Sequence, residues 1–345
     1  MLPITVSFAG QGDSECWDDY VNTHPDGCVF QTYAWRRAVE STYGLRPYYL
    51  MAKRGEKICG VLPLFLVGGR LFGRVLATCP YASSGSVLSD GAVEARSLVE
   101  PAIDLARRLN VDYLELKSRS ITECEGLERH TDYLNYDLPL GDPETVWKSR
   151  LKKETRTSVR RSEKSGLVLE QGHHLLDAFY EMMTLNMRRL GTPVHSKEFY
   201  QNLLRCFGQQ ADIWAVTHQG LPISAVLFLR YRQEIAGLAR CSRDEYFHLR
   251  PNSFLYWEMF RQACHAGVGR YDFGRSLKGS GAAKFKETWG AEAKPLYYEY
   301  FLNKRNRIPG AQLENPRYQL VSAVWRRLPL SFTRLLGPHL IKDIP

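Results

Sequence analysis

Hydrophobic and polar residues alternate with the period of a strand or of a helix along the first third of the chain. Ile4 to Phe8 alternates as an edge strand does, and Leu98 to Leu109 carries its apolar residues on one helical face. Gly44 is a stop signal for a helix that begins at Phe30. The pattern predicts strands at residues 4–8, 47–51, 57–67 and 111–116, and helices at residues 14–23, 30–43 and 98–109. This order of elements indicates a mixed α/β domain.

The same order of elements returns in the second half. Asp142, Pro143 and Glu144 provide an N-cap, an N1 proline and an early acid for a helix from Asp142 to Lys164. The pattern then predicts strands at residues 167–171, 212–217, 223–231, 234–241 and 294–302, and helices at residues 175–190, 196–207 and 254–266. The amino-acid sequences of the two halves show no internal repeat. We expect an α/β (α+β) fold with domains at residues 1–141 and 142–303 and a tail at residues 304–345.

The charge of the chain favours a polyanionic partner. The chain has 345 residues, more than a single hydrophobic core usually supports, which agrees with two domains. Hydrophobic residues make up 44% and charged residues 24%, as in an ordinary globular protein, and the net charge is +9. RNA, a phosphorylated lipid-linked substrate and an anionic membrane surface all fit this charge, which does not choose between them.

The eight cysteines are scattered, with no C-x-x-C pair and no histidine cluster at the spacing of metal ligands. We expect buried, reduced thiols and no metal site. The longest apolar run, residues 58–67, is too short to span a bilayer, and residues 1–10 lack the regions of a signal peptide. These features predict a cytoplasmic protein, and they leave peripheral contact with the inner face of the membrane open.

A cationic stripe follows the helix predicted at the start of the second half. At 100° per residue its members share one face, with Lys152 and Arg161 on the flanks. The stripe consists of Lys153, Arg156, Arg160 and Lys164. It has two interpretations, a solvated helix surface or a track that binds the phosphates of a polyanion.

One motif is the strongest candidate for chemistry. A short strand, Tyr271 to Ser276, is followed by a Gly/Ser loop at residues 277–281 and by a short helix with Lys286 just inside it. Such a corner presents backbone donors and positive charge to an anionic or polarised group. The alternative is a tight turn with a solvated lysine.

The string Asp272-Phe273-Gly274-Arg275-Ser276, with Phe285-Lys286 and Trp289-Gly290 downstream, resembles the FemAB-like branch of the GNAT acyltransferases. Within that branch it resembles the FemAB family proteins associated with exosortase (PEP-CTERM) systems, which have a BioF2-like acetyltransferase domain. The resemblance covers most of the chain and is most specific between Trp147 and Pro295. It implies two tandem GNAT-like domains.

The resemblance also implies a reaction, the transfer of an acyl or aminoacyl group to an amine of a cell-envelope precursor. The acceptor would be peptidoglycan-like, an exopolysaccharide or a lipid-linked saccharide. The donor would be aminoacyl-tRNA or acyl-CoA, with no bound cofactor and no DNA partner. The competing hypothesis is a catalytically inactive GNAT-like scaffold that binds RNA or an anionic glycolipid.

Acyl transfer needs a neutral amine, an activated carbonyl and positive charge where the oxyanion develops. Lys286 and Arg275 are therefore the candidate stabilisers, helped by the amides near Gly279 and Gly281. Asp272 is the candidate that orients Arg275 or accepts a proton. No covalent nucleophile is expected, and His173, His174 and His195 are expected to be surface residues.

The remaining candidates are substrate-binding residues that match the pattern of the family. They are Tyr81 in the loop at residues 79–85, Arg188 and Thr192 in an Arg-Arg-Leu-Gly-Thr-Pro segment, Asn252 and Tyr256 at a helix start, and Ser276, Gly279 and Gly281 in the motif. Tyr256 has the alternative of a core position, and Arg188 that of complementing a helix dipole. The helix after residue 251, with Asn252 or Ser253 as its N-cap, lacks the Gln/Arg-x-x-Gly-x-Gly/Ala loop that binds coenzyme A, which weakens the case for that donor.

The tail after residue 304 mixes hydrophobic and basic residues behind a linker with two prolines. The segment from Tyr318 to Leu340 is rich in leucine and valine and contains Trp325. Its cations are Arg326, Arg327 and Arg334, and Arg317 and Lys342 adjoin it. It either packs back on the body of the protein or lies on a membrane surface.

Overall fold

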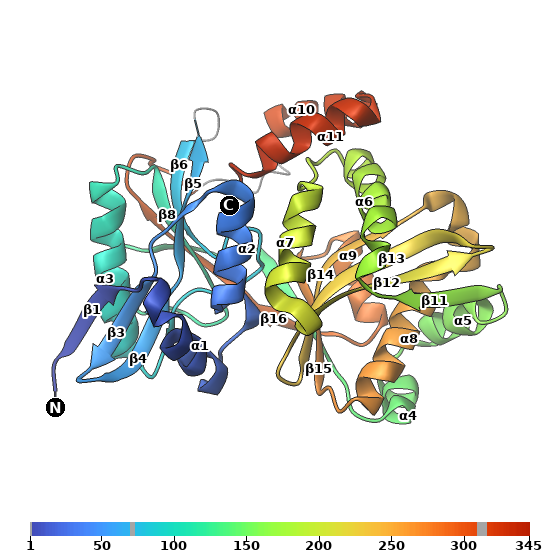
Figure 1. The fold of residues 1–345 in the computed structure, drawn as a ribbon, viewed down its shortest axis with the longest axis horizontal. Helices are drawn as coiled ribbons and strands as arrows, with labels where there is room; N and C mark the ends of the chain where they lie inside the picture. Colours follow the sequence, from blue (N-terminus) through green and yellow to red (C-terminus); the bar gives the residue numbers. More distant parts are fainter. Residues whose placement is uncertain (1, 70–72, 309–315) are drawn as a thin grey trace. The chain divides into compact units, whose positions relative to one another are not determined.

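The computed structural model describes residues 2–69, 73–308 and 316–345, and these residues divide into two compact units (Figure 1). Unit 1 comprises residues 1–132, 295–319 and 339–345, and unit 2 comprises residues 133–294 and 320–338. Each unit is therefore assembled from segments that are far apart in the sequence.

Unit 1 contains two sheets. The first has the order β1 (Ile4–Phe8), β3 (Leu50–Arg54), β4 (Lys57–Leu62) and β7 (Leu88–Ser89). The second has the order β2 (Arg46–Pro47), β5 (Leu64–Gly69), β6 (Gly73–Thr78), β8 (Tyr113–Ser118), β17 (Tyr297–Leu302) and β9 (Glu128–His130). The helices are α1 (Ser14–Thr23), α2 (Tyr33–Tyr43) and α3 (Ala92–Arg108).

The core of unit 1 forms where α3 packs on these strands. Leu98 and Ala102 of α3 are buried together with Leu62, Leu76 and Leu114 of the strands. The strand predicted at residues 57–67 is two strands, β4 and β5, which belong to different sheets. Pro63 separates them, since proline cannot donate to a ladder.

Unit 2 contains one sheet of seven strands. Its order is β11 (Leu167–Gln171), β12 (Ala211–His218), β13 (Leu221–Tyr231), β14 (Glu234–Ser242), β15 (Arg270–Leu277), β10 (Tyr133–Pro139) and β16 (Glu292–Pro295). The helices assigned wholly to unit 2 are α4 (Pro143–Thr145), α5 (Lys153–Ser162), α6 (Leu176–Leu190), α7 (Lys197–Phe207), α8 (Pro251–His265) and α9 (Gly281–Thr288). The tail forms α10 (Pro316–Arg327) and α11 (Leu330–Ile341), whose residues 320–338 belong to unit 2.

Helices cover both faces of the sheet in unit 2. The core under α8 contains Trp214, Val216 and Phe228, which alternate along β12 and β13. Because successive side chains on a strand point to opposite faces, the residues between them face the other side. There α6 contacts β13 and β14, and α7 contacts β12.

Each unit contains a short parallel strand pair next to a strand from the other half of the chain. In unit 2, β14 and β15 pair in parallel through three residue pairs, from Glu234 with Arg270 to Ala236 with Asp272. In unit 1, β6 and β8 pair in parallel through three residue pairs in the same way. The strands beside β15 and β8 are β10 and β17. The pattern predicts β17 as the last strand of the second half, whereas its partner β8 lies in unit 1.

The helix predicted from Asp142 to Lys164 is interrupted. Asp142 caps α4 as expected, since its Oδ1 accepts from the amides of Glu144 and Thr145, both at 3.0 Å. A π-helical turn follows at Val146–Arg150, and Lys152 then has an extended backbone before α5 begins. Only residues 153–162 of the predicted cationic helix are therefore continuous.

Gly290 fixes the end of the motif against this interruption. It has a φ of +79°, and a Cβ there would lie 2.3 Å from the carbonyl oxygen of Arg150. The amide of Lys152 donates to the carbonyl of Thr288 at 3.0 Å. The segment after α9 and the segment before α5 thus approach at backbone distance.

We expect Gly290→Ala to destabilise the protein by about 3 kcal/mol, because a left-handed alanine costs about 1–2 kcal/mol and the forced contact adds a similar amount. Gly166→Ala is the control, since Gly166 also has a positive φ, +63°, but no atom within 4 Å of its Cβ position. Urea unfolding of both variants measures the difference. Equal losses in the two variants would contradict the close approach at Gly290.

Candidate active site

The predicted motif folds as expected into a strand, a loop and a helix. β15 ends at Leu277, and α9 begins at Gly281. Ser280 caps α9, because its Oγ accepts from the amide of Ala283 at 3.2 Å. Gly279 has a φ of +75° and is exposed.

Lys286 on α9 reaches back to the strand. Its Nζ donates to the carbonyl oxygens of Gly274 at 2.7 Å and Arg275 at 2.9 Å. The residue is only 8% exposed, and burial lowers the pKa of its ammonium to about 8, although the nearby charge of Asp272 opposes the shift. Two of the three N–H groups of the ammonium are thus used within the protein. The prediction of a solvated lysine in a simple turn is wrong.

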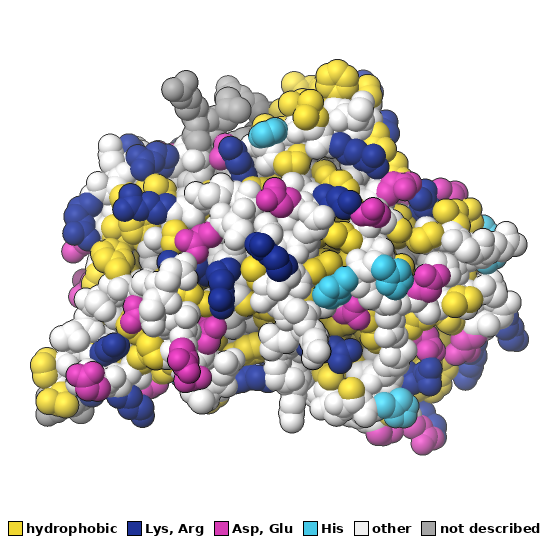
Figure 2. Space-filling model, in the orientation of Figure 1, with side chains coloured by type: hydrophobic (Ala, Val, Ile, Leu, Met, Phe, Trp, Pro, Cys, Tyr) yellow, Lys and Arg dark blue, Asp and Glu magenta, His cyan; other side chains and the backbone are white. Residues whose placement is uncertain are grey.

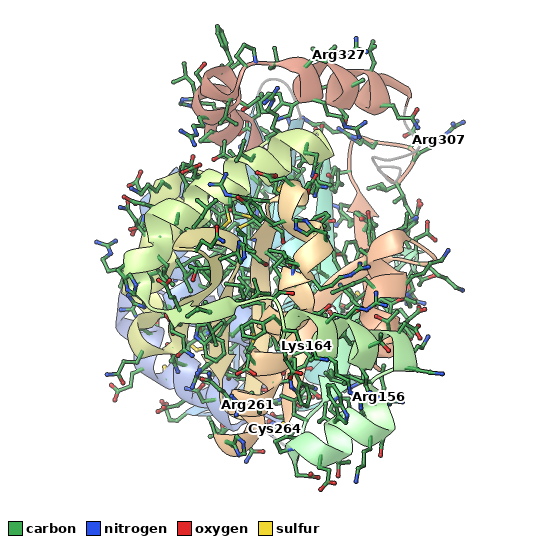
Figure 3. All side chains as sticks on the ribbon, turned by 90° about the vertical axis from the view of Figure 1, so that its right-hand side faces the viewer. Arg156, Lys164, Arg261, Cys264, Arg307 and Arg327 are labelled. Atoms are coloured by element: carbon green, nitrogen blue, oxygen red, sulfur yellow. The ribbon has the colours of Figure 1, made fainter. Side chains whose placement is uncertain are left out.

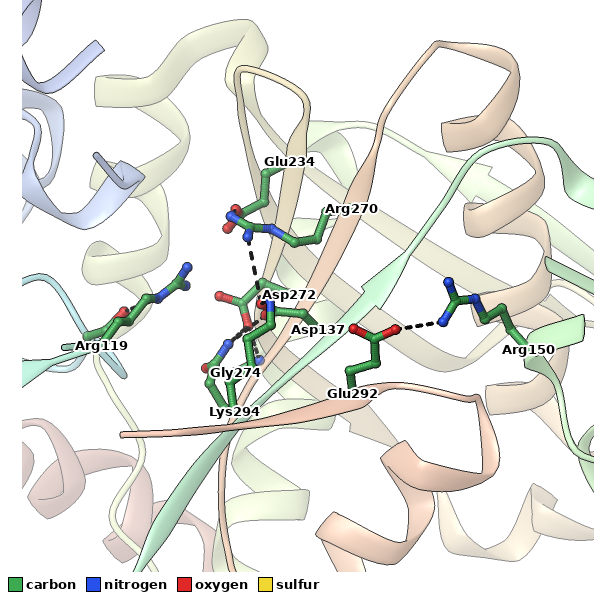
Figure 4. Close-up of polar contacts among 11 residues, drawn as sticks. Arg119, Asp137, Arg150, Glu234, Arg270, Asp272, Gly274, Glu292 and Lys294 are labelled. Carbon is green, nitrogen blue, oxygen red and sulfur yellow. Dashed lines mark hydrogen bonds and ion pairs between the residues drawn. The ribbon is translucent and has the colours of Figure 1, made fainter. Parts of the chain in front are cut away.

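Asp272 holds the bend of β15 from the other side. Its Oδ1 accepts from the amide of Gly274 at 2.7 Å and from Nδ2 of Asn135 at 2.9 Å. The same Nδ2 donates to Asp137 at 2.7 Å, and Asp137 in turn accepts from Nζ of Lys294 at 2.9 Å (Figure 4). Asp272 and Asp137 are each only 1% exposed.

Basic residues balance these buried carboxylates. Arg270 lies 3.7 Å from Asp137 and forms a further ion pair with Glu234 (Figure 4). Buried charges are tolerated where they are paired and hydrogen-bonded. The network therefore connects β14, β15, β10 and β16 through side chains. Among the described residues, no three His, Cys, Asp or Glu side chains are grouped as metal ligands.

The strands diverge directly beyond this network. After Ala236 and Asp272, β14 and β15 no longer pair, and Gly237, Leu238 and Ala239 are half-buried although β14 lies in the middle of the sheet order. Arg240, also on β14, is exposed, and its guanidinium lies 5.3 Å from the ring centroid of Phe285 on α9. The half-buried residues 237–239 and the exposed Arg240 of β14 thus lie beside the motif.

Arg275 is exposed, and its guanidinium lies 5.3 Å from the ring centroid of Tyr133. Ser276 is 7% exposed, whereas Gly281 is exposed as the first residue of α9. The structure therefore brings Lys286, Arg275 and Asp272 together at one corner, as the motif predicted. Their roles in a reaction stay a prediction.

The corner between β14 and α8 differs from a pyrophosphate site. A 3₁₀ helix, Asp244–Leu249, carries Asp244 and Glu245 in its first turn. α8 begins at Pro251, which has no N–H, after Arg250 in the left-handed conformation. The prediction that Asn252 or Ser253 caps this helix is wrong. Asp244 is paired with Arg189 at 2.7 Å, and Pro251 removes one amide donor from the start of α8.

Asn252 is an internal contact. Its Oδ1 accepts from the hydroxyls of Ser224 at 2.8 Å and Ser242 at 2.7 Å. The start of α8 is therefore fixed to β13 and β14.

A shallow pocket lies nearby, between α6 and the end of β14. Its lining is Met182, Leu185, Asn186, Arg189, Ser242, Arg243, Asp244 and Glu245.

Tyr256 is part of an aromatic core, the alternative that its position left open. It is 5% exposed, and its ring centroid lies 5.5 Å from that of Trp289 and 5.8 Å from that of Phe285. Burial raises the pKa of its hydroxyl. Packing accounts for this residue.

Three candidates lie away from the motif in the sequence. Arg188 is half-buried near the end of α6, and the amide of Thr192 donates to the carbonyl of Met187 at 3.0 Å beyond the left-handed Gly191. Tyr81 belongs to unit 1, where its hydroxyl donates to the carbonyl of Lys342 at 2.9 Å. The break predicted at Gly191 is confirmed.

His195 does not lie where the sequence led us to expect it. It stacks on Phe199 with ring centroids 4.5 Å apart, and burial lowers the pKa of its imidazole to about 3. The side chain is thus neutral at physiological pH and half-buried against the rings of Phe199 and Tyr200, rather than a fully exposed surface histidine.

Only part of the cationic stripe is exposed to solvent. Arg156 is half-buried, and its Nη1 donates to the carbonyl of Leu151 at 2.6 Å and to that of Trp147 at 3.3 Å (Figure 3). It satisfies carbonyls that the interrupted helix leaves open. Lys153, Arg160 and Lys164 are exposed. The exposed part of the stripe therefore consists of these three residues.

Asn135, Asp137 and Lys294 were missed by the sequence analysis. Lys294 lies on β16, whereas Asn135 and Asp137 lie on β10. On β10, Leu134, Tyr136 and Leu138 alternate with the polar residues, which is a period-2 signal. That signal marks a strand, but it points to a solvated polar face, whereas Asn135 and Asp137 are buried.

Comparisons with known proteins agree with this fold. A family described as "Acetyltransferase (GNAT) domain" matches residues 149–287, which contain α5 to α9 except the last residue of α9. No curated protein matches the sequence. The crystal structure of FemX covers 92% of this chain and 100% of its own, with a TM-score of 0.69 and 15% identity.

Two further solved structures share the fold over most of their length. L-PGS from Bacillus licheniformis covers 93% of this chain and 100% of its own, with a TM-score of 0.57 and 13% identity. A tandem GNAT protein from the clavulanic acid biosynthesis pathway covers 87% and 98%, with a TM-score of 0.54 and 11% identity. At these identities the likeness is one of fold. The match to the GNAT domain family is confined to residues 149–287, and the predicted α/β fold with mixed sheets is confirmed.

Proposed function

We propose that the chain transfers an acyl or aminoacyl group to a primary amine of a cell-envelope precursor. One observation carries the proposal, the buried Lys286 that is fixed to β15 where β15 leaves β14. Its ammonium has a third N–H beyond the two that the backbone uses. The GNAT match and the FemX-like fold support the reaction class.

In this proposal the amine nitrogen attacks the donor carbonyl beside β14. The C–N bond forms, the C–O bond of an aminoacyl ester or the C–S bond of a thioester breaks, and the amine proton passes to the leaving group or to water. Lys286 and Arg275 stabilise the oxyanion, and the fixed Lys286 costs little reorganisation. Asp272 keeps Gly274 in place, so that the carbonyls that hold Lys286 keep their position.

The donor that we favour is aminoacyl-tRNA. At the start of α8, Pro251 has no N–H to offer a pyrophosphate, and the side chain of Asn252 is used within the protein. RNA, by contrast, fits the exposed cations on and after α5. The acceptor would be a peptide or sugar amine, on an exopolysaccharide or lipid-linked precursor if the association with exosortase systems holds.

A second candidate is a GNAT-like scaffold that binds RNA or an anionic glycolipid without turnover. The contacts of Lys286 favour it, because Nζ donates to two backbone carbonyls and lies 5.3 Å from the ring centroid of Tyr136, as a structural lysine does. The two candidates differ in what the lysine charge does beyond folding.

Lys286→Met should reduce turnover about 100- to 1000-fold, because one oxyanion donor is lost. It should also destabilise the protein by about 1–3 kcal/mol, because two carbonyls lose their donor. Purified protein is assayed with labelled aminoacyl-tRNA or acyl-CoA and amine acceptors, at temperatures where each variant is folded. Trp289→Phe is the control for lost stability, since Trp289 is 1% exposed and packs in the same core. Normal turnover of folded Lys286→Met would contradict the assignment.

The pH dependence follows from the lowered pKa of Lys286. Its ammonium is charged below a pH of about 8 and neutral above it, so turnover that needs the charge should fall as the pH rises through about 8. In Lys286→Arg the falling limb should move to higher pH, because the guanidinium stays charged. The measurement is kcat/KM as a function of pH. An unchanged falling limb in Lys286→Arg would assign that limb to another group.

Charge reversal at Lys153, Arg160 and Lys164 should weaken RNA binding and reduce the slope of log K against log salt by about 2–3, since up to three phosphate contacts are lost. Arg156 is left intact because it caps the helix break. The control reverses Lys57, Arg74 and Arg108, which are exposed cations of unit 1. Equal effects in the two triple variants, measured by filter binding, would mean that only net charge matters.

A further inference from the structure

The tail carries a continuous apolar surface. Six large hydrophobic side chains of α10 and α11 are between 42% and 68% exposed: Leu320, Val321, Val324, Phe332, Leu335 and Leu336. We call them the apolar face. Hydrophobic side chains gather over these helices at the top of the view in Figure 2. Large exposed apolar patches on a folded protein mark interaction sites.

The opposite side of these helices packs on unit 2, which confirms the packing alternative for that side. Ser322, Trp325, Thr333 and Gly337 are buried. A Cβ on Gly191 would lie 2.0 Å from Oγ of Ser322, and one on Gly337 would lie 3.0 Å from the carbonyl oxygen of Val194. These contacts join the tail to the segment between α6 and α7, above which α10 and α11 are drawn in Figure 1.

This packing fixes the rotation of both helices. At about 100° per residue, Leu320, Val321 and Val324 lie on one side of α10, and Ser322 and Trp325 lie on another. The guanidinium of Arg326 also donates to the carbonyl of Leu190 at 3.4 Å. The apolar face cannot turn inward without losing these contacts, so its exposure is a property of the folded unit.

The charge around the apolar face has one sign. Arg326, Arg327 and Arg334 are exposed on the same two helices. Asp343 is the sole acid of the sequence from residue 316 to residue 345. At 100° per residue Arg327 lies beside Leu320, whereas Arg326 donates to the carbonyl of Leu190 in unit 2. Apolar residues beside an arginine on a positively charged tail match an anionic bilayer, where the apolar side chains enter the acyl boundary and the cations attract lipid phosphates.

We propose that the apolar face docks on an anionic membrane surface, with α10 and α11 lying in the plane of the interface. Each helix has 12 residues, and none of the described helices has the length and apolar content needed to cross a bilayer. A second copy of the chain fits less well, because pairing two such faces would bring their arginines together. The proposal does not depend on the acyl-transfer chemistry.

Vesicle flotation of the full-length protein tests the proposal. The vesicles are phosphatidylcholine alone, or phosphatidylcholine with about 30% phosphatidylglycerol. The protein should float with the anionic vesicles and less at about 1 M salt than at about 0.1 M salt. Val321→Glu with Leu335→Glu should weaken this binding at least about tenfold, because the charges enter the apolar boundary.

The matched control is Val93→Glu with Val168→Glu, which changes the charge equally at valines that are 67% and 57% exposed elsewhere. It should float as the wild type does. Val324→Asn with Leu336→Asn provides a second test without added charge, and circular dichroism verifies that each variant is folded. Equal flotation of tail and control variants would overturn the proposal. So would a wild-type dimer that Val321→Glu with Leu335→Glu separates, seen by sedimentation in the absence of vesicle binding.

Discussion

The burial of one ammonium group against a strand is the interaction on which the second unit depends. Lys286 joins α9 to β15 through two backbone carbonyls, at the residues where β15 has left β14. A buried charge of this kind needs compensation, and Asp272 supplies it while also holding Gly274. The aromatic core of Tyr256, Phe285 and Trp289 lies on the same helix and its neighbour. The fixed cation and the end of the β14–β15 pairing thus lie at the same corner of unit 2.

The sequence predicted the elements whose signals are local. β1, α1 and β11 have the predicted bounds, and Gly44 and Gly191 end their helices as expected. The interruption near Leu151 was missed, because helical periodicity continues across it and only the tertiary contact of Gly290 with Arg150 reveals it. The pairing of β17 with β8 was missed for a related reason, since it joins residues about 180 positions apart in the sequence, for which short-range pattern holds no signal.

The candidate site divides in the same way. The motif placed Lys286, Arg275 and Asp272 together because strand, loop and helix follow one another directly in the chain. The partners that make Asp272 stable, Asn135 and beyond it Asp137 and Lys294, come from β10 and β16, and no spacing rule connects them to the motif. Arg156 and Asn252 have the residue types of ligand-binding groups, yet their side chains satisfy internal polar atoms. Residue type alone does not separate these two uses.

The central claim is that a donor binds where β14 and β15 diverge. Hydrogen–deuterium exchange with a non-hydrolysable mimic of the aminoacyl-tRNA 3′ end tests it most directly. The account predicts slower exchange in residues 237–242 and 274–286 when the mimic is bound, with little change in the 3₁₀ helix from Asp244 to Leu249. The claim would be contradicted if saturating mimic left residues 237–242 and 274–286 unprotected. Protection of the 3₁₀ helix from Asp244 to Leu249 in their place would also contradict it.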